Sequence, residues 1–359
     1  MLTQGDTAPW FQARSSAGRL VNLNIFGGQY VVLSFLGSST FGAIPQLIQE
    51  IERQRAVFDA IDACFIGISI DPDDERQKRL QPQSPGLSFL WDFDASISRM
   101  YDAARSQGRY IVHSLVLDPN LRVLAFIPMD GDGTAHARRI VEVLQSVPPV
   151  KELEGLPPIL VLPHIFEVPL CKALIDRHAT DAGEGLGYAT MENGRAVNKY
   201  DNAKRRARDW IIKDRDVISV LESRLRRRLF PQVEKVFQYS ATQIEDFVVA
   251  RYDAAEGGET GGFFVPHRDN TNPLTAFRKF AVTIALNSGE YDGGGLHFPE
   301  YSSRGFHAPT GGAIVFSCSL MHGVRPVTRG KRFVCPLFIF DDEAAKLRDQ
   351  SRLAHNPAK

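Results

Sequence analysis

The chain has 359 residues, of which 43% are hydrophobic and 23% are charged, which is the composition of an ordinary globular protein. Basic and acidic residues both number 42, so the formal net charge is zero and gives no reason to expect a nucleic-acid or membrane partner. The sequence contains no apolar run as long as a membrane span and no apolar stretch typical of a signal peptide near its first residues, and we therefore expect a cytoplasmic protein.

The cysteines agree with that compartment. Cys64, Cys171, Cys318 and Cys335 are far apart and form no C-x-x-C pair. This spacing argues against a disulfide framework and against a zinc site, and it fits a reducing cytoplasm. The length of the chain favours two domains.

The N-terminal half alternates apolar runs with a helical pattern. Residues 30–37, 64–71 and 114–119 are rich in β-branched and aromatic side chains, and they predict strands. Residues 44–61 place apolar side chains at helical spacing and predict a helix between the first two strands. Strand–helix–strand alternation is typical of an α/β layer with a partly parallel sheet.

A proline-rich segment interrupts the middle of the chain. Residues 147–158, VPPVKELEGLPP, contain four prolines, and such stretches commonly separate domains because proline cannot donate a backbone hydrogen bond. We therefore assign residues 1–146 to a first domain, 147–158 to a linker and 159–341 to a second domain. The tail, residues 342–359, is expected to be a fraying helix or a disordered end.

The second half begins with patterns typical of a strand and helices, and its residue pattern then changes. A strand is expected at 159–166, and helices are expected at 168–179 and 215–237. From residue 244 on, short apolar runs are separated by Gly, Asn, Asp and Pro, which predicts an antiparallel sandwich or jelly roll. The strands expected there are 244–253, 279–287, 294–300, 311–318 and 332–340.

Two histidines and an aspartate form the most specific chemical pattern. His267 and Asp269 stand two residues apart in VPHRDN, so they share one side of an extended strand end. His322, in MHGVRP, follows 53 residues after Asp269, which leaves room for strands to go out and return. Two imidazoles and one carboxylate are the ligands of non-haem Fe(II) oxygenases. The alternative is that all three are turn or surface residues.

Four segments, in order, resemble the prolyl 4-hydroxylase-like 2-oxoglutarate/Fe(II) oxygenases over roughly the second half of the chain. They are FVVARYDAAEGG, FVPHRDN, FAVTIALNSGEYDGGGLHF and APTGGAIVFSCSLMHGVRPVTRGKRF. The resemblance implies a double-stranded β-helix, or jelly-roll barrel, with flanking helices and with iron inside one mouth. It also implies Fe(II), 2-oxoglutarate and O2 as cofactor and co-substrates, and it leaves ascorbate open as a further cofactor.

Carried over by position, the resemblance makes His267, Asp269 and His322 the catalytic iron ligands. It makes Arg332 the residue that binds the distal carboxylate of 2-oxoglutarate. A guanidinium suits that role because its planar fork matches a carboxylate and stays charged. Lys331 is the neighbouring alternative, but adjacent strand residues face opposite sides and the G-x-R spacing favours Arg332.

One position departs from the pattern of that family. Many relatives carry Ser or Thr two residues after the arginine, where this chain has Val334. A second hydrogen bond to the co-substrate must then come from elsewhere, and Tyr252 in ARYD is the candidate. Tyr252 could equally be an ordinary core residue, and Arg332 could belong to a surface ion pair.

Other polar residues carry less specific signals. His297 and His307 are expected to be ordinary strand residues, and Cys318 and Cys335 are expected to be inert buried thiols. The basic stretches KRRARD, 204–209, and ESRLRRRLF, 222–230, could meet an anionic substrate. A solvated helix face is the more common meaning of such runs, because long basic side chains usually cover surface.

Residues 1–146 resemble the thioredoxin-fold peroxiredoxins, on the segments GDTAPWFQARSSAGRLVNL, YVVLSFLGSSTFGAIPQL, CFIGISIDPDD and SLVLDPNLRVLAF. In that family a reactive cysteine opens a helix whose N-terminus stabilises thiolate. This chain has Ala43 at the matching position, and Val112 where the family carries an arginine. Cys64 lies in an apolar strand that shields it. We therefore expect a redoxin scaffold without peroxidase chemistry, serving oligomerisation, substrate delivery or partner docking.

The expected function is that of a 2-oxoglutarate- and Fe(II)-dependent dioxygenase that hydroxylates an aliphatic C–H bond. Its substrate is an amino-acid-like compound, a peptidyl residue of prolyl type or a small metabolite, and the loops 253–262 and 270–279 are long enough to act as lids. One alternative is an iron- and 2-oxoglutarate-responsive regulatory or partner-binding protein with a non-catalytic redoxin domain. The other, a thiol peroxidase, is disfavoured by Ala43.

Overall fold

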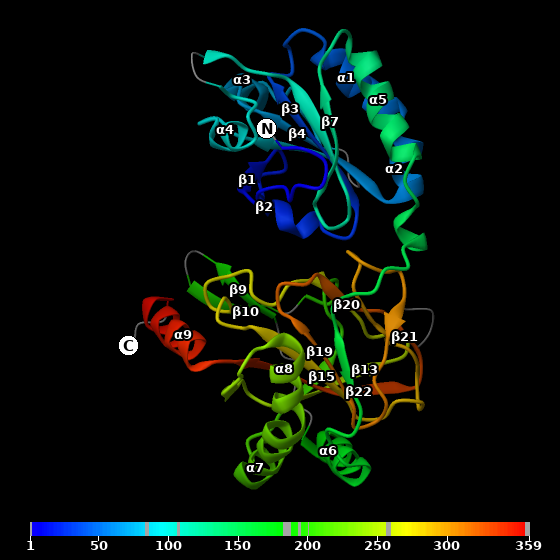
Figure 1. Cartoon of the computed structure of the whole chain (residues 1–359), viewed down its shortest axis with the longest axis vertical. Coiled ribbons are helices and arrows are strands. Elements are labelled where there is room, and N and C mark those ends of the chain that lie inside the picture. Colours follow the sequence, from blue (N-terminus) through cyan, green and yellow to red (C-terminus); the bar gives the residue numbers. More distant parts are fainter. Residues whose placement is uncertain are drawn as a thin grey trace. The chain divides into compact units, whose positions relative to one another are not determined.

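The computed structural model describes residues 2–82, 86–105, 108–181, 188–192, 195–199, 201–255 and 260–355. The chain forms two compact units, each with its own sheets (Figure 1). The first unit contains Met1–Leu156 and Pro299–Ser303, and the second contains Pro157–Phe298 and Arg304–Lys359. The chain thus passes from one unit to the other within the proline-rich segment.

The first unit is built on a mixed seven-stranded sheet. Its strands are β1 (Gln12–Ser15), β2 (Leu20–Asn22), β3 (Tyr30–Gly37), β4 (Ala63–Ser69), β5 (Leu87–Trp91), β6 (His113–Leu117) and β7 (Val123–Pro128). They lie in the order β2-β1-β5-β4-β3-β6-β7. β3 pairs in parallel with β4, and β4 with β5, whereas β6 runs antiparallel to β3 and β7. The three runs expected to be strands are β3, β4 and β6, and the sheet is partly parallel as expected.

Two separate cores lie on the two faces of this sheet. The helices of the unit are α1 (Ile44–Arg53), α2 (Arg55–Ile61), α3 (Pro72–Arg76), α4 (Ser96–Met100) and α5 (Gly133–Gln145). Tyr30 and Val32 of β3 pack with residues of α1, α2 and α5, while Val31 and Leu33 pack with residues of β1 and α4. Successive strand residues point to opposite faces, so a strand buried on both faces needs the continuous apolar run seen in the sequence.

The single helix expected at 44–61 is in fact two helices. The chain leaves the helical conformation at Gln54, where ψ is 13°, and α2 begins at Arg55. Leu47 and Phe58, one on each helix, are both buried in the same core. The apolar spacing therefore survives the break, and it could not reveal the break because glutamine is an ordinary helix former.

The second unit contains two antiparallel sheets. The strands of the larger sheet are β8 (Leu160–Leu162), β11 (Arg208–Ile211), β12 (Gln243–Ile244), β13 (Val248–Asp253), β15 (Phe280–Ala285), β19 (Ala313–Ser317) and β22 (Lys331–Phe340). Those of the smaller sheet are β14 (Phe264–His267), β17 (Leu296–His297), β18 (Gly305–Phe306) and β20 (His322–Val324). The larger sheet has the order β11-β13-β22-β15-β19-β8, with β12 paired to β22, and the smaller has the order β14-β20-β17-β18.

The larger sheet has one face packed on helices and one face open to a cavity. The helices are α6 (Val168–Asp181), α7 (Arg215–Arg224) and α8 (Phe230–Phe237), and a π-helical turn, Leu225–Leu229, joins the last two. Phe333, Cys335 and Ile339 of β22 are buried in a core with these helices. The alternate residues Arg332 and Val334 line the cavity. The two-residue period of the strand thus separates the packed face from the functional one.

The remaining elements include two short two-stranded antiparallel sheets and a C-terminal helix. β9 (Tyr188–Glu192) pairs with β10 (Arg195–Lys199), and β16 (Asp292–Gly293) pairs with β21 (Val327–Arg329). Helix α9 spans Asp342–His355, and its Ala344 is buried with Phe277 and Phe340. Ser351 Oγ of α9 donates a hydrogen bond of 2.7 Å to the carbonyl oxygen of Pro273. Of the two alternatives expected for the tail, the structure has a helix up to His355, and Ala344 and Ser351 attach it to the second unit.

The expected fold class is confirmed. A thioredoxin-like α/β unit precedes a double-stranded β-helix with flanking helices. None of the helices within the described ranges is both long enough and apolar enough to cross a membrane.

Candidate functional site

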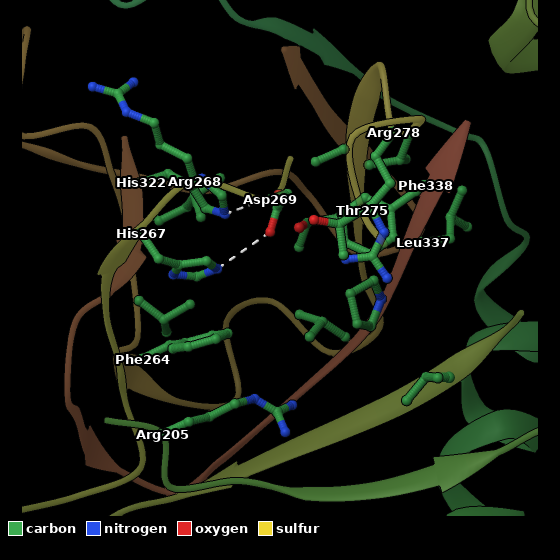
Figure 2. Close-up of a pocket in the computed structure, with 18 of the residues that line it drawn as sticks. Arg205, Phe264, His267, Arg268, Asp269, Thr275, Arg278, His322, Leu337 and Phe338 are labelled. Atoms are coloured by element: carbon green, nitrogen blue, oxygen red, sulfur yellow. Dashed lines mark ion pairs between the residues drawn. The ribbon is translucent and has the colours of Figure 1, made fainter. Parts of the chain in front are cut away.

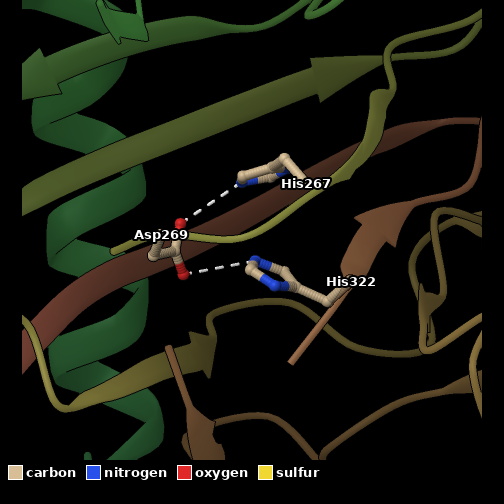
Figure 3. A group of neighbouring side chains, drawn as sticks. All are labelled: His267, Asp269 and His322. Atoms are coloured by element: carbon tan, nitrogen blue, oxygen red, sulfur yellow. Dashed lines mark ion pairs between the residues drawn. The ribbon is translucent and has the colours of Figure 1, made fainter. Parts of the chain in front are cut away.

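The three residues of the predicted metal site lie together at one end of the smaller sheet. His267 ends β14 and His322 begins β20, and the two are register partners in the antiparallel pair. His267 Nε2 lies 3.3 Å from Asp269 Oδ1, and His322 Nε2 lies 3.4 Å from Asp269 Oδ2. Figure 3 shows both imidazoles directed at the carboxylate. One ligand atom from each residue fits within a group no wider than 4.8 Å.

Backbone carbonyls fix the orientation of both imidazole rings. His267 Nδ1 lies 2.9 Å from the carbonyl oxygen of Val265, and His322 Nδ1 lies 3.0 Å from that of Leu320. A carbonyl oxygen only accepts hydrogen bonds, so Nδ1 carries the hydrogen in each ring. The lone pair of Nε2 then points toward Asp269, which is how histidine ligands are commonly held around a metal.

The protonation states in the cluster also suit a metal. Burial lowers the pKa of His322 to about 4, so this imidazole is neutral at neutral pH. Burial by itself would raise the pKa of Asp269, but His322 and His267 outweigh it and bring that pKa down to about 2. Metal binding requires a neutral imidazole and an ionised carboxylate, and the cluster offers both.

Asp269 Oδ2 is buried and has no hydrogen-bond partner among the described residues. A buried carboxylate oxygen without a donor is costly unless a cation compensates it. Two imidazole nitrogens and one carboxylate, gathered on one side of a cavity, are the donor set of non-haem Fe(II) sites. The residues present therefore fit Fe(II), and among the described residues no other group of three His, Cys, Asp or Glu side chains offers such a set.

Aromatic rings and backbone bonds hold the ligands in place. The ring of Phe264 stacks on His267 at 3.8 Å between centroids, and Phe316 meets His322 edge-on at 4.6 Å. The amide of Asp269 donates a hydrogen bond of 2.9 Å to the carbonyl oxygen of Cys318. This bond ties the turn that carries the carboxylate to the segment that leads into β20.

The cluster opens into a cavity of about 730 Å³ between the two sheets of the second unit, part of which is shown in Figure 2. The larger sheet contributes cavity-lining residues from β13, β15, β19 and β22, and the smaller sheet contributes residues from β14, β17 and β20. Among them are Tyr252, Thr283, Phe316, Arg332, Val334, Phe264, Leu296 and Val324. A space bounded by both sheets is the usual ligand site of a β-barrel mouth.

Arg332 is buried in the wall of this cavity. The residue is only 4% exposed, and its Nε and Nη1 have no hydrogen-bond partner among the described residues. Its Cζ lies 5.1 Å from the ring centroid of Tyr252, its register partner on β13. Lys331 is exposed, as expected for the opposite face of the strand. A buried guanidinium with unused donors is a suitable binding site for a carboxylate.

Tyr252 and Val334 also line the cavity. Tyr252 is buried, and its side chain interacts with the guanidinium of Arg205. Val334 presents only methyl groups there, so the position where relatives carry Ser or Thr donates no hydrogen bond in this chain. Any second donor to a ligand of Arg332 must come from a different strand.

Two arginines of the cavity wall were not foreseen. Arg205 is paired with Asp209, with Nη2–Oδ1 at 2.6 Å, and its Cζ lies 5.4 Å from the ring centroid of Phe264. Arg278 forms two bonds of 2.7 Å with Glu245. Figure 2 shows the two arginines in different parts of the wall, Arg205 next to Phe264 and Arg278 next to Phe338.

The expectation that 204–209 forms a solvated helix face was therefore wrong. Residues 208–211 belong to strand β11, and both Arg205 and Asp209 line the cavity. A charge run carries no information on burial, because buried and exposed ion pairs use the same residue types. Arg278 could have been suspected from its place between the H-x-D turn and β15.

The second basic stretch lies away from the cavity. Arg224 and Arg228 form ion pairs with Glu167, and Arg226 donates to the carbonyl oxygen of Thr242. None of these arginines is among the residues that line the cavity. They tie the helices together on the packed side of the larger sheet, so they do not face a ligand there.

The other expected bystanders are also outside the cluster. His297 lies in β17 and His307 follows β18, and neither belongs to the group around Asp269. Cys318 and Cys335 are free and buried, and burial raises the pKa of Cys335 to about 12. Of the two loops considered as lids, 256–259 lie outside the described residues, whereas the segment around Pro273 is bound to α9.

In the first unit, Ala43 is the residue immediately before α1, at the end of the loop that follows β3. Cys64 lies within β4, is buried, and has a pKa that burial raises to about 12. Val112 is buried next to β6. The start of α1 therefore has no thiol in the described part of the unit.

Comparison with known proteins matches each unit to a different family. Residues 247–340 match the 2OG-Fe(II) oxygenase superfamily, and residues 4–126 match the AhpC/TSA family. A PKHD-type hydroxylase of Nitrobacter winogradskyi is 27% identical over 177 residues, which cover 48% of this chain and 75% of that protein.

Two solved structures illustrate the same division. The peroxidoxin BcpB of Mycobacterium tuberculosis is 20% identical, with a TM-score of 0.38, and the match covers 41% of this chain and 99% of that one. A prolyl hydroxylase of Trichoplax adhaerens, solved with a peptide fragment of hypoxia inducible factor, is 18% identical with a TM-score of 0.39, over 54% of this chain and 86% of that one.

The family matches and the His–Asp–His cluster agree with one another. The 2OG-Fe(II) oxygenase match spans all three residues of the cluster and Arg332. The family implies Fe(II), 2-oxoglutarate and O2 as the cofactor and co-substrates. In sequence order, the chain thus carries an AhpC/TSA-like domain followed by a 2OG-Fe(II) oxygenase domain, and it is a 2-oxoglutarate-dependent hydroxylase.

Proposed function

We propose that His267, Asp269 and His322 hold Fe(II), and that Arg332 binds the distal carboxylate of 2-oxoglutarate in the same cavity. The observation that supports this most is a pair of buried groups of opposite charge with unused hydrogen-bonding capacity: among the described residues, no donor bonds to Asp269 Oδ2 and no acceptor bonds to Nε or Nη1 of Arg332. A divalent cation would satisfy the first and a carboxylate the second. When bound, Fe(II) supplies the activation of O2, with 2-oxoglutarate converted to succinate and CO2 and one oxygen atom entering a substrate C–H bond.

Arg332 and Tyr252 would share the work of orienting the co-substrate. The guanidinium provides a planar pair of donors and the positive charge, so it fixes both the position and the rotation of a carboxylate. Tyr252 is the register partner of Arg332 and lines the same wall, which makes its hydroxyl a candidate second donor. The interaction of Tyr252 with Arg205 would keep that hydroxyl in place.

For the substrate we propose an amino-acid-like compound, a peptidyl residue of prolyl type or a small metabolite, with an aliphatic C–H bond as the target. The paired Arg278 and Glu245 in the wall offer both hydrogen-bond donors and acceptors, as an amide or an amino acid requires. Phe338, whose ring centroid lies 3.8 Å from Arg278 Cζ, adds an apolar surface that suits an aliphatic ring. The names of the hydroxylase relatives are consistent with this class.

For the first unit we propose a scaffold without peroxidase chemistry, which serves self-association or the binding of a protein partner. Support comes from the absence of a cysteine near the start of α1, together with two complete cores around the sheet. The second candidate function, an iron- and 2-oxoglutarate-responsive regulatory or partner-binding protein, requires the same non-catalytic first unit. Free, buried cysteines are also consistent with the proposed cytoplasmic location.

The metal assignment predicts that His322→Ala lowers both bound iron and turnover, because two of three ligands cannot hold Fe(II) as firmly. Iron content after dialysis, measured by mass spectrometry of the metal, is the readout. His297→Gln changes a neighbouring strand histidine outside the cluster and should keep its iron. Normal iron content and turnover in His322→Ala would contradict the assignment.

The co-substrate assignment predicts a split between two neighbouring residues. Arg332→Ala should weaken 2-oxoglutarate binding by about ten- to a hundredfold, since a charge-assisted hydrogen bond contributes roughly 1.5–3 kcal/mol. Iron binding should remain. Lys331→Ala, on the exposed face of the same strand, is the matched control and should leave the dissociation constant of 2-oxoglutarate unchanged. The reverse result would assign the anchor to Lys331.

The reaction itself can be tested by product analysis. The enzyme with Fe(II), 2-oxoglutarate and O2 is incubated with free L-proline, a proline-rich peptide or a digest of ribosomal proteins, and each is scanned for a gain of one oxygen atom. We expect one of these compounds to be hydroxylated, with succinate formed in equal amount. If none is modified and 2-oxoglutarate is consumed only with a metabolite that is not amino-acid-like, the prolyl analogy fails. If it is never consumed, the regulatory function is favoured.

Peroxidase chemistry in the first unit is tested separately. Protein stripped of iron should not consume peroxide with a dithiol reductant, because no thiolate lies at the start of α1. Wild type and Cys64→Ser should behave alike. Robust dithiol-dependent turnover that is lost in Cys64→Ser would show that the scaffold assignment is mistaken.

A further inference from the structure

The three consecutive glycines of the sequence motif EYDGGGLHF have no role in the chemistry described so far. Gly293 ends β16, Gly295 precedes β17, and Gly294 lies between them. Gly294 has a φ of +63°, a conformation that most side chains disfavour. Its position in the second unit brings it against the side chain of Arg332.

The stem of Arg332 occupies the space where a side chain at residue 294 would begin. A Cβ built on Gly294 would lie 2.6 Å from Arg332 Cδ, 3.0 Å from Val327 Cγ2 and 3.4 Å from Tyr291 Cε2. Contacts under 3.0 Å essentially never occur for a real Cβ. Any residue other than glycine therefore competes with the arginine for the same volume.

Arg332 has little freedom to give way. The clash falls on Cδ, in the middle of the side chain, so the guanidinium beyond it must move as well. That guanidinium lies 5.1 Å from the ring of Tyr252, and the residue is buried. A second cavity, of about 10 Å³, is lined by Arg332, Tyr291 and His307 and has room for one water molecule at most.

We propose that Gly294 is a positioning residue for the co-substrate anchor. By having no side chain, it lets the stem of Arg332 pass and aims the guanidinium into the main cavity. The inference rests on the proposed role of Arg332, because it concerns where that guanidinium points. It predicts that a side chain at residue 294 weakens the binding of 2-oxoglutarate and leaves the iron ligands untouched.

Two variants and one control separate this effect from backbone strain. Gly294→Asn keeps a residue that tolerates positive φ but adds the Cβ, and Gly294→Ala adds the Cβ alone. Gly289 has a φ of +90° and, among the described residues, no atom within 4 Å of a built Cβ. Gly289→Ala therefore imposes backbone strain without touching Arg332, and it is the matched control.

The measurement is the dissociation constant of 2-oxoglutarate for the full-length Fe(II) protein, titrated without O2, together with iron content. Gly294→Asn should raise that constant by about ten- to a hundredfold, toward the value for Arg332→Ala. Gly289→Ala should bind as wild type does. The decisive variant combines Gly294→Asn with Arg332→Ala: it should bind no more weakly than Arg332→Ala alone, because the added Cβ then meets no arginine stem.

Each other outcome is informative. The positioning role is overturned if Gly294→Asn binds 2-oxoglutarate as wild type does. It is also overturned if Gly294→Asn weakens 2-oxoglutarate binding by the same factor in the Arg332→Ala variant as in wild type. If Arg332→Ala itself leaves binding unchanged, the proposed anchor fails, and the inference fails with it for that separate reason. If Gly294→Asn and Gly294→Ala do not fold, the thermal melt of the combined variant decides: adding Arg332→Ala should restore folding if the clash is the cause, and failure to do so overturns the proposal.

Discussion

The antiparallel register between β14 and β20 is the constraint on which the site depends. It places His267 opposite His322, and the ring centroids are then 4.5 Å apart. A shift of one residue would turn one histidine to the other face of the sheet and separate the pair. Asp269 follows two residues after β14, and the hydrogen bond that its backbone N–H donates to the carbonyl oxygen of Cys318 brings the carboxylate back to the same point. The candidate metal site is thus a consequence of strand pairing, supplemented by one turn.

The cavity next to this site is organised by the cost of burying charge. Arg205 is satisfied by Asp209, and Arg278 by Glu245, so these four charges are balanced within the wall. Among the described residues, nothing bonds to Nε and Nη1 of Arg332 or to Oδ2 of Asp269. Because an uncompensated buried charge destabilises a fold, its persistence marks the places where ligands complete the structure.

The first unit shows the opposite relation between fold and chemistry. Its stability comes from apolar residues on both faces of a mixed sheet, and Ala43 belongs to neither core. A change of side chain at the start of α1 therefore leaves the packing that defines the fold intact. This explains how a redoxin-like unit can persist without a thiol at that position, and why similarity of fold says little about reaction there.

The sequence by itself predicted most element types, the grouping of His267, Asp269 and His322, and the inward direction of Arg332 rather than Lys331, because each follows from a short local pattern. Periods of two or 3.6 residues report which face is buried, and H-x-D spacing reports a shared strand side. The break at Gln54 could not be foreseen, since glutamine neither favours nor forbids a helix end. Nor could the attachment of α9 to the second unit be foreseen, because the contact of Ala344 with Phe277 joins distant segments.

Only the tertiary structure decided which charged residues face the cavity. Arg205 and Arg278 resemble ordinary surface arginines in the sequence, and their partners, Asp209 and Glu245, become meaningful only when the strands assemble. The same holds for Gly294, whose need to be glycine arises from an arginine 38 residues later in the chain. Local patterns record the direction in which a side chain points, whereas contact between separate strands depends on the complete sheet order. That order places Arg332 in the same cavity as the His–Asp–His cluster.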